Sequence, residues 1–299
     1  MGTEKDKIEI LSVEALEKNR RTVEALRRLS RATRVDFGWH YLLDLTWIIS
    51  NLDSIPGGRF LDAGAGSGLM QWYLVENRAQ EVISADRDSR FDLPLVMRSR
   101  YKVQGVRAAD LGPAWNVLKG NVSRASGAGK LTYALRGLAG LALIALPKAF
   151  PGKVLIYNQD LANMPEIADN SLDAIVALSS LEHNTPEGLP RVVAELMRKL
   201  KPGGKLLATL GAARDKDWFH QASQGWCYTD ASLRRLFGLA PDAPSNYARY
   251  DELFTALRNC AELRDNLAKM YFTSGDNGMP WGKWDPQYQP VGVCKIKPA

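Results

Sequence analysis

The stretch RFLDAGAGSG, residues 59–68, is a short apolar run that ends in three glycines spaced two apart. Glycine adopts backbone conformations that strain other residues, so this stretch predicts a strand followed by a sharp turn. Residues 69–77 continue as a helix, whose first N–H groups have no partners within the helix. Asp86 stands 22 residues after Gly64, at the end of a second apolar run over residues 81–85. A glycine-rich turn with an acid at this separation predicts a site for an adenosine-containing cofactor, because the carboxylate accepts hydrogen bonds from the ribose hydroxyls.

Apolar runs alternate with helical patterns along the chain, which predicts a parallel sheet with helices on both faces. The expected strands are residues 59–62, 81–85, 153–157, 172–178, 205–210 and 291–297. The expected helices are residues 8–33, 39–52, 69–77, 189–200, 230–237 and 251–270.

Two parts of the chain do not fit a plain α/β alternation. Residues 1–55 form an expected N-terminal helical extension, and residues 56–299 form the main domain. Between the second and third strands, residues 89–152 are far longer than the dozen or so that a crossover needs. We therefore expect a helical insert there, acting as a cap or lid rather than a long structureless loop.

Positive charge is concentrated in this insert. Between Arg90 and Lys153 the chain has eleven basic and two acidic residues, a net +9, whereas the whole chain carries +6. The same segment holds the most apolar stretch, residues 131–150, which is interrupted by charge and too short to cross a bilayer. Two interpretations remain open: a buried helix with a solvated basic rim, and a helix lying on an anionic membrane surface.

Composition excludes several classes of protein. Hydrophobic residues make up 45% and charged residues 24% of the chain, which is typical of a globular protein. Three widely spaced cysteines and three histidines argue against a disulfide scaffold, a cysteine-rich zinc site and a histidine-rich metal centre, so no metal is expected. The charged N-terminus lacks the apolar core of a signal peptide, so we expect a cytoplasmic protein, with a peripheral position on the inner face of the membrane left open.

The glycine motif itself narrows the cofactor. A dinucleotide fingerprint would need a third glycine where Leu69 or Gln71 stands, so that pattern fails. The pattern D-x-G-x-G-x-G from Asp62 to Gly68 instead resembles motif I of the class I S-adenosylmethionine-dependent methyltransferases. Further segments resemble that family in the right order, and the strand-four motif points to its type-11-like subgroup. They are Asp86, Asp160-Leu161 before Pro165, Ser171 to Val176 followed by Leu181-Glu182-His183, and Leu200 to Gly204.

The resemblance implies a Rossmann-like, seven-stranded, mostly parallel sheet with the last strand antiparallel, and S-adenosyl-L-methionine as the cofactor. It also implies that the cofactor lies over the ends of strands one and four. The cofactor-binding residues that it implies are Asp62, Gly64, Gly66, Gly68, Asp86, Asp160, Leu161 and Ser179. For Asp62, a purely structural role in holding the glycine turn is an equally open interpretation.

Methyl transfer is an in-line displacement that requires alignment of the two reactants and exclusion of water. A hydroxyl acceptor often needs a base as well. His183 follows strand four and His220 lies in the loop DWFHQASQGWCYT, residues 217–229, so these two histidines are the candidate catalytic residues. A structural or substrate-orienting role is the alternative for each of them.

The acceptor is narrowed by exclusion. Methylation of a base amino group usually goes with an Asn/Asp-Pro-Pro-aromatic turn, whereas residues 178–181 read LSSL, and the nearest cysteine for cytosine C5 chemistry is Cys227. We expect a small-molecule, sugar or lipid-linked acceptor, with O-methylation favoured. Residues 93–152 would cap the acceptor pocket and contact an anionic membrane or a phosphate-bearing lipid carrier. The alternatives are a non-catalytic S-adenosylmethionine-binding protein and an RNA methyltransferase; nucleic acid ranks lower because the insert has no aromatic-rich basic repeat.

Overall fold

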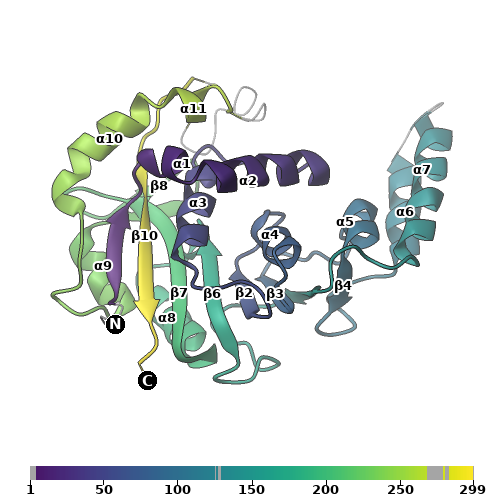
Figure 1. The fold of residues 1–299 in the computed structure, drawn as a ribbon, viewed down its shortest axis with the longest axis horizontal. Helices are drawn as coiled ribbons and strands as arrows, with labels where there is room; N and C mark the ends of the chain where they lie inside the picture. The colour runs from purple at the N-terminus through teal and green to yellow at the C-terminus, as the bar shows by residue number, and fades with distance from the viewer. Residues whose placement is uncertain (1–4, 125, 127–128, 268–278, 280–282, 299) are drawn as a thin grey trace. The chain divides into compact units, whose positions relative to one another are not determined.

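The computed structural model describes residues 5–124, 126, 129–267, 279 and 283–298 of the chain. It divides into two compact units. Unit 1 joins Met1–Asp53 to Leu161–Ala299, and unit 2 is Ser54–Asp160. Figure 1 labels the helices and strands of both units.

Unit 2 is built on four parallel strands in the order β2-β3-β5-β4. They are β2 (Arg59–Ala63), β3 (Glu81–Asp86), β4 (Lys102–Gly105) and β5 (Lys153–Asn158). Helix α4 (Met70–Glu76) connects β2 to β3, as the sequence predicted. The apolar residues of β2 and β3 are almost all buried, which fits strands covered on both faces.

The insert of unit 2 is not purely helical, because it contributes strand β4 to the sheet. Sequence analysis missed this strand because KVQG is short and half polar, and its hydrogen-bonding partner β5 follows about fifty residues later. The helices of the insert are α5 (Leu95–Arg100), α6 (Ala114–Arg124) and α7 (Gly129–Ile144).

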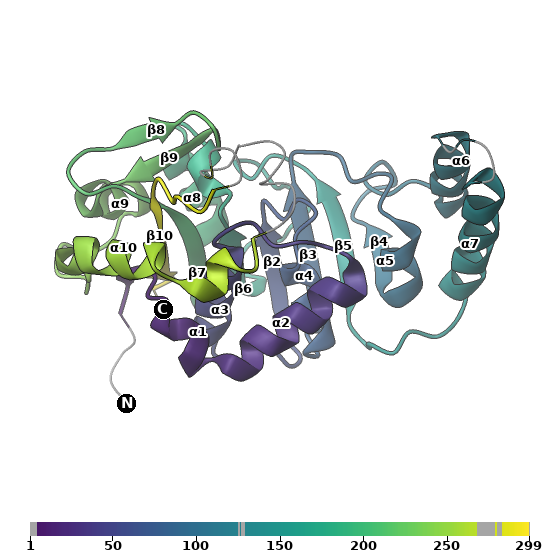
Figure 2. The ribbon, with the colours of Figure 1, turned by 90° about the horizontal axis from the view of Figure 1, so that it is seen from above.

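Helices α6 and α7 run side by side in both views (Figures 1 and 2). A small apolar cluster of Leu95, Val117 and Leu118 joins them to α5. A Cβ added to Gly137 would lie 2.1 Å from Cδ1 of Leu118, so glycine allows this close crossing of the two helices.

Unit 1 contains the other six strands, with the order β1-β10-β7-β6 along its main path. These are β1 (Lys7–Ile10), β10 (Gln289–Ile296), β7 (Leu200–Ala212) and β6 (Leu172–Leu178). Strand β10 is antiparallel to both neighbours, whereas β6 and β7 are parallel. The segment predicted as a loop forms a hairpin of β8 (Trp218–His220) and β9 (Gly225–Tyr228), and β9 also pairs with the end of β7.

The helices of unit 1 broadly follow the predicted patterns. They are α1 (Glu14–Lys18), α2 (Arg20–Thr33), α3 (Tyr41–Asn51), α8 (Leu189–Lys199), α9 (Asp230–Phe237), α10 (Tyr250–Arg258) and α11 (Ala261–Arg264), with the short 3-10 helices η1 (Leu181–His183) and η2 (Tyr247–Arg249). The predicted helix 8–33 begins late because residues 7–10 form β1 instead. The predicted helix 251–270 breaks into α10 and α11, and residues 268–270 lie outside the described residues.

The mixed α/β, Rossmann-like architecture predicted from the sequence is therefore confirmed, with ten strands among the described residues rather than seven. Strand β1, strand β4 and the two strands of the β8–β9 hairpin are the four that were not among the six strand ranges expected from the sequence. Strand β10 supplies the predicted antiparallel strand at the end of the chain.

We predict that Gly152→Ala destabilises the protein by about 1–3 kcal/mol, because overpacking forces backbone shifts. A Cβ at Gly152 would lie only 2.0 Å from the carbonyl oxygen of Ala79, which cannot rotate away. Gly120 is the matched control, since it lies in α6 with no atom within 4 Å of an added Cβ. Gly120→Ala should stabilise by about 0.5–1 kcal/mol through helix propensity. Urea unfolding of both variants measures the difference, and equal midpoints would contradict the packing explanation.

Candidate functional site

The glycine turn of unit 2 follows β2 and is held against the end of β3. Gly64 has φ +75° and Gly66 has φ +46°, so both use the backbone region that favours glycine. The N–H groups of Gly64 and Ala65 donate to the carbonyl oxygen of Ala85, at 2.9 and 3.0 Å. These bonds fix the turn beside the last residue of β3, which is Asp86.

Asp86 is joined directly to the turn. Its Oδ2 accepts a 2.7 Å hydrogen bond from the N–H of Gly66, and its Oδ1 accepts a 2.8 Å bond from the N–H of Asp88. The side chain is half-buried, and a Cβ on Gly66 would come to 3.9 Å from Oδ2. A carboxylate has about four lone-pair positions, so Asp86 keeps capacity for further donors such as ribose hydroxyls.

The Asp62 side chain is buried rather than exposed at the surface of the turn. It is 2% exposed, and its Oδ2 accepts from the N–H of Gln71 in the first turn of α4 at 3.2 Å. Burial raises the pKa of Asp62 to about 7, and the nearby Asp86 adds to this effect, whereas Arg90 and the Gln71 N–H oppose it. The contacts of Asp62 are those of a residue that positions helix α4.

Arg90 is a residue that sequence analysis counted only as part of the basic segment. Its guanidinium donates to the hydroxyl and the carbonyl of Ser84 and to the carbonyl of Tyr157, at 3.3 Å for the last. It also interacts electrostatically with Asp86 and Asp62, while burial lowers its own pKa. Arg90 therefore compensates the charge of Asp62 and Asp86 and connects β3 to β5 by hydrogen bonds. The signal available in the sequence was its place four residues after Asp86.

The end of β5 is fixed by Asp110, which is 1% exposed. Its Oδ1 accepts from the N–H of Asn158 at 3.0 Å, and Arg107 holds the same carboxylate. These partners keep the pKa of Asp110 below its ordinary value despite burial. Asp160, predicted to meet the adenine, follows β5 by two residues and is exposed.

Two of the predicted cofactor-binding residues, Leu161 and Ser179, belong to unit 1. Leu161 is 9% exposed, and Ser179 has φ +46° directly after β6. The Ser179 hydroxyl donates to Oε1 of Glu182 at 2.5 Å, and its N–H donates to the Thr209 hydroxyl at 3.1 Å. Glu182 is 6% exposed, and burial raises its pKa. The other oxygen of Glu182, Oε2, is buried and has no hydrogen-bond partner among the residues that the structure describes.

The two predicted catalytic histidines carry their protons on opposite nitrogens. Nδ1 of His183 lies 2.9 Å from the carbonyl oxygen of Gln224, which can only accept, so Nδ1 carries the proton. When His183 is neutral, its Nε2 is thus a free base. His183 is exposed at the end of η1, which suits a role at a surface-accessible site.

His220 has the opposite arrangement. Its Nδ1 accepts from the N–H of Ser223 at 3.2 Å, so the proton of the neutral ring is on Nε2. Burial lowers the pKa of His220, which favours the neutral form of the ring. His220 is thus set up to donate a hydrogen bond rather than to remove a proton.

A cluster that the sequence did not reveal lies beside these residues in unit 1. His40 stands directly before α3 and Asp44 lies in the first turn of this helix, and both side chains are buried. Nδ1 of His40 lies 2.7 Å from Oδ2 of Asp44. The Thr209 hydroxyl donates to the same Asp44 oxygen at 3.2 Å. The Tyr288 hydroxyl lies 3.4 Å from Nε2 of His40, and the Tyr288 ring lies 5.2 Å from the ring of His220. Residues 248 positions apart meet here, so no local pattern could have found this cluster.

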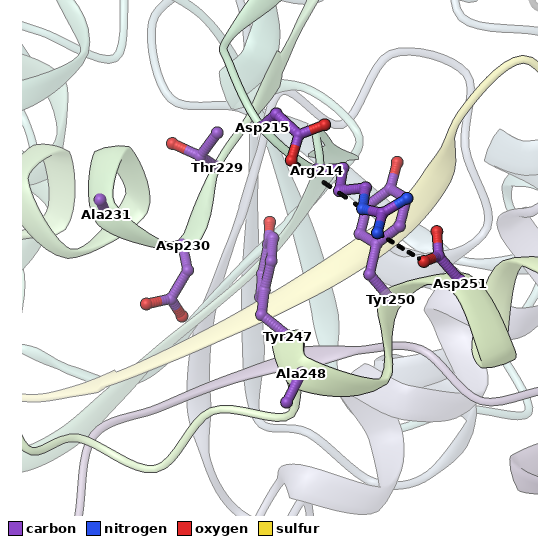
Figure 3. A pocket seen from close by; sticks show the side chains of 9 residues that line it. All are labelled: Arg214, Asp215, Thr229, Asp230, Ala231, Tyr247, Ala248, Tyr250 and Asp251. Carbon is purple, nitrogen blue, oxygen red and sulfur yellow. Dashed lines mark ion pairs between the residues drawn. The ribbon is translucent and has the colours of Figure 1, made fainter.

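A separate cavity of about 520 Å³ opens in unit 1 (Figure 3). Its lining residues are Arg214, Asp215, Thr229, Asp230, Ala231, Tyr247, Ala248, Tyr250 and Asp251. None of them is a predicted cofactor or catalytic residue. Arg214 pairs with Asp251 at 2.9 Å, and the hydroxyls of Tyr247 and Tyr250 donate to backbone carbonyls. We assign no ligand to this cavity.

Within the described part of the chain, no group of three or more His, Cys, Asp or Glu side chains is arranged to hold a metal ion.

Comparison with known families gives one match. Residues 138–208 match the family model described as a methyltransferase domain, Methyltransf_11. The match includes β5, β6 and the first part of β7, but not the glycine turn. Over these residues, the match agrees with the resemblance to methyltransferases that the sequence motifs indicated. No curated protein matches the chain.

Solved structures of similar fold include several methyltransferases. The [4+2]-cyclase SpnF is 14% identical to this chain with a TM-score of 0.45, and the matched region covers 93% of this chain and 81% of the SpnF chain. A geranyl diphosphate C-methyltransferase from Streptomyces coelicolor is 12% identical with a TM-score of 0.42, covering 98% and 91%. A phosphoethanolamine N-methyltransferase from Haemonchus contortus is 14% identical with a TM-score of 0.47, covering 96% and 60%. At these values the similarities do not identify an acceptor.

We predict that Asp62→Asn becomes more stable relative to the wild type as the pH rises from about 4 to 8. The folded-state pKa of about 7 lies above the ordinary value of 3.8, so the folded protein binds this proton more tightly than the unfolded chain. Stability from this group is complete below the unfolded pKa and is lost as the pH rises through 7. Urea unfolding across this pH range measures it, with Asp88→Asn as the control for a general charge effect. A stability difference that is flat or falls with pH would contradict the prediction.

Proposed function

We propose that this protein transfers a methyl group from S-adenosyl-L-methionine to a hydroxyl of a small-molecule, sugar or lipid-linked acceptor. The observation that carries the proposal is the bond between the Gly66 N–H and the Asp86 carboxylate, which sets an acid at the edge of a glycine-rich turn. The methyltransferase match of residues 138–208 supports the same reaction.

The donor-binding role falls to unit 2. Asp86 would accept the ribose hydroxyls, and the backbone of Gly64, Gly66 and Gly68 would lie against the nucleoside without Cβ obstruction. The fit is favourable because an added Cβ on Gly66 would stand 3.9 Å from Asp86 Oδ2, where the sugar would have to approach. Asp160, Leu161 and Ser179 remain proposed contacts to the rest of the cofactor. When bound, S-adenosylmethionine supplies an electrophilic methyl on a cationic sulfur.

The acceptor-side residues belong to unit 1. His183 Nε2 would accept a hydrogen bond from the acceptor hydroxyl, because its Nδ1 is already committed to Gln224. His220 Nε2–H would donate to a second polar atom of the acceptor, because its Nδ1 accepts from Ser223. Together they would orient the nucleophilic oxygen, and orientation is the main requirement of an in-line displacement.

A contact with an anionic membrane is the second part of the proposal. Among the described residues, eight of the nine exposed large apolar side chains lie between Val96 and Leu146. Leu131, Leu135 and Leu138, at helical spacing on α7, are 68%, 59% and 51% exposed. Such a patch is rare on a protein surface that faces only water.

The charge of the same segment fits anionic head groups. Residues 111–159 contain no acidic residue, while α6 and α7 carry Lys119, Arg124, Lys130 and Arg136. Apolar side chains beside basic ones are typical of helices that lie in the membrane interface. In the described part of the chain, none of the helices has the length and hydropathy of a membrane span.

We predict that Asp86→Ala weakens binding of S-adenosylmethionine by about 10- to 100-fold, since hydrogen bonds to a charged group contribute about 1.5–3 kcal/mol each. Isothermal titration calorimetry measures the change, with Asp88→Ala as a neighbouring acid outside the proposed contacts. Absence of binding heat in the wild type would refute the donor assignment, and equal affinities in wild type and Asp86→Ala would refute the role of Asp86.

We predict that the combined change of Leu131, Leu135 and Leu138 to Ser lowers binding to vesicles of phosphatidylcholine and phosphatidylglycerol by at least about tenfold, since burying a leucine contributes about 1.5–3 kcal/mol. Phe219→Ser is the control, because Phe219 is an exposed apolar residue outside the insert. Co-sedimentation measures binding. The proposal fails if the intact protein does not bind, or if salt-sensitive retention on RNA replaces vesicle binding.

A further inference from the structure

Helix α3 contains a buried acid in surroundings that do not require one. Asp44 is 0% exposed, and its neighbours Leu42, Leu43 and Leu45 are buried as well. Removing a carboxylate from water is costly unless partners compensate it. A helix that only had to pack would carry an apolar residue at this position.

The compensation of Asp44 is arranged on one oxygen. Oδ2 binds Nδ1 of His40 at 2.7 Å and accepts from the Thr209 hydroxyl at 3.2 Å. The buried Oδ1 has no hydrogen-bond partner within the described part of the chain. His40 is itself only 2% exposed. A pure helix-capping role would not explain why the carboxylate is paired with a buried, titratable ring.

The far side of the His40 ring faces a phenol. Because Asp44 accepts the Nδ1 proton, Nε2 of neutral His40 holds a lone pair, and the Tyr288 hydroxyl lies 3.4 Å from it. An acid that orients an imidazole, whose other nitrogen meets a hydroxyl, is the arrangement that activates hydroxyl groups in many enzymes. Such distances are often long before substrate binds.

This group of three lies among the acceptor-side residues. The Tyr288 ring is 5.2 Å from the ring of His220, which the sequence predicted at the acceptor site. Glu182, which precedes His183, interacts electrostatically with both His40 and Tyr288. The predicted histidines therefore lie next to the new cluster within unit 1.

We propose that Tyr288, His40 and Asp44 form a proton relay that takes the proton of the acceptor hydroxyl during methyl transfer. This inference rests on the function proposed above and adds the route of the proton. Tyr288 would touch the acceptor as a catalytic residue, whereas Asp44 is a positioning residue that acts through His40.

The step is balanced. The acceptor oxygen forms a bond to the methyl carbon, and the sulfur–methyl bond breaks to leave neutral S-adenosylhomocysteine. The acceptor O–H proton passes to the Tyr288 oxygen while the Tyr288 proton passes to Nε2 of His40. Burial holds the pKa of Tyr288 well above its ordinary value, so the phenol gives up its proton only as it receives another. The resulting imidazolium is stabilised by the carboxylate of Asp44.

Several titratable groups face the His40 ring. They are Asp44 and Tyr41 from α3, Tyr288 before β10, Glu182 from η1 and, across Tyr288, His220 from β8. Glu182 and Asp44 are the acids of this group.

The first experiment needs no acceptor. The chain has three histidines, so nitrogen NMR of histidine-labelled protein, assigned with His40→Gln, resolves each ring. The relay requires a protonated Nδ1 and an unprotonated Nε2 on His40, and His220 provides the internal contrast with the reverse pattern. A proton on Nε2 of His40 in the resting protein at neutral pH overturns the proposal, because the relay would have no place for the acceptor's proton.

The second experiment uses Tyr288→Phe, which keeps the ring and removes only the hydroxyl. On alcohols and phenols of graded acidity that the wild type methylates, kcat should fall by about 100-fold or more for weakly acidic hydroxyls. The loss should shrink for phenols that are already ionised, and the affinity for S-adenosylmethionine should not change. A purely structural role would reduce all acceptors equally, and that result overturns the proposal.

The two levels of the proposal fail in different ways. If the wild type gives no binding heat with S-adenosylmethionine, the proposed function itself is wrong. If the wild type binds the donor and methylates hydroxyls, but Tyr288→Phe retains full activity while His183→Asn loses it, only the relay is wrong. His183→Asn should slow all hydroxyl acceptors, ionised or not, because His183 is proposed to orient them.

Discussion

The hydrogen bond between the Gly66 N–H and the Asp86 carboxylate is the constraint around which unit 2 is arranged. It requires a turn that only glycine adopts easily, with φ +46° at Gly66, and it fixes the end of β3 against the end of β2. The buried Asp62 and the half-buried Asp86 both interact electrostatically with Arg90, which compensates their charge. The proposed donor site thus depends on a balance of charge under the turn as much as on the turn itself.

In unit 1, buried polar groups form a connected network of hydrogen bonds. Ser179, Glu182, Thr209, Asp44 and His40 are connected by hydrogen bonds from the end of β6 through β7 to α3. A network of this kind is expensive in an apolar interior, and it retains unpaired oxygens on Glu182 and Asp44. Buried polar groups whose desolvation is not fully compensated by hydrogen bonds are typical of binding or catalytic sites rather than of regions that only pack.

The insert of unit 2 differs from both of these regions, because several of its apolar side chains are exposed to solvent. A small apolar cluster around Leu118 forms the buried face of the insert, and Gly137 allows α7 to approach that residue closely. The outer face keeps Leu131, Leu135 and Leu138 in solvent beside basic residues. These exposed leucines and their basic neighbours are the surface that we propose for contact with an anionic membrane.

The sequence by itself determined the Rossmann-like class, the glycine turn and the place of Asp86 beside it, because these depend on local patterns of glycine, apolar runs and one fixed separation. It failed at β1, β4 and the β8–β9 hairpin, since short strands acquire their identity from partners far along the chain. The proton positions on His183 and His220 were also beyond it, because the backbone groups of Gln224 and Ser223 decide them. Only the tertiary structure brought Tyr288 to His40, across 248 residues, because that contact arises from packing and leaves no periodicity in the sequence.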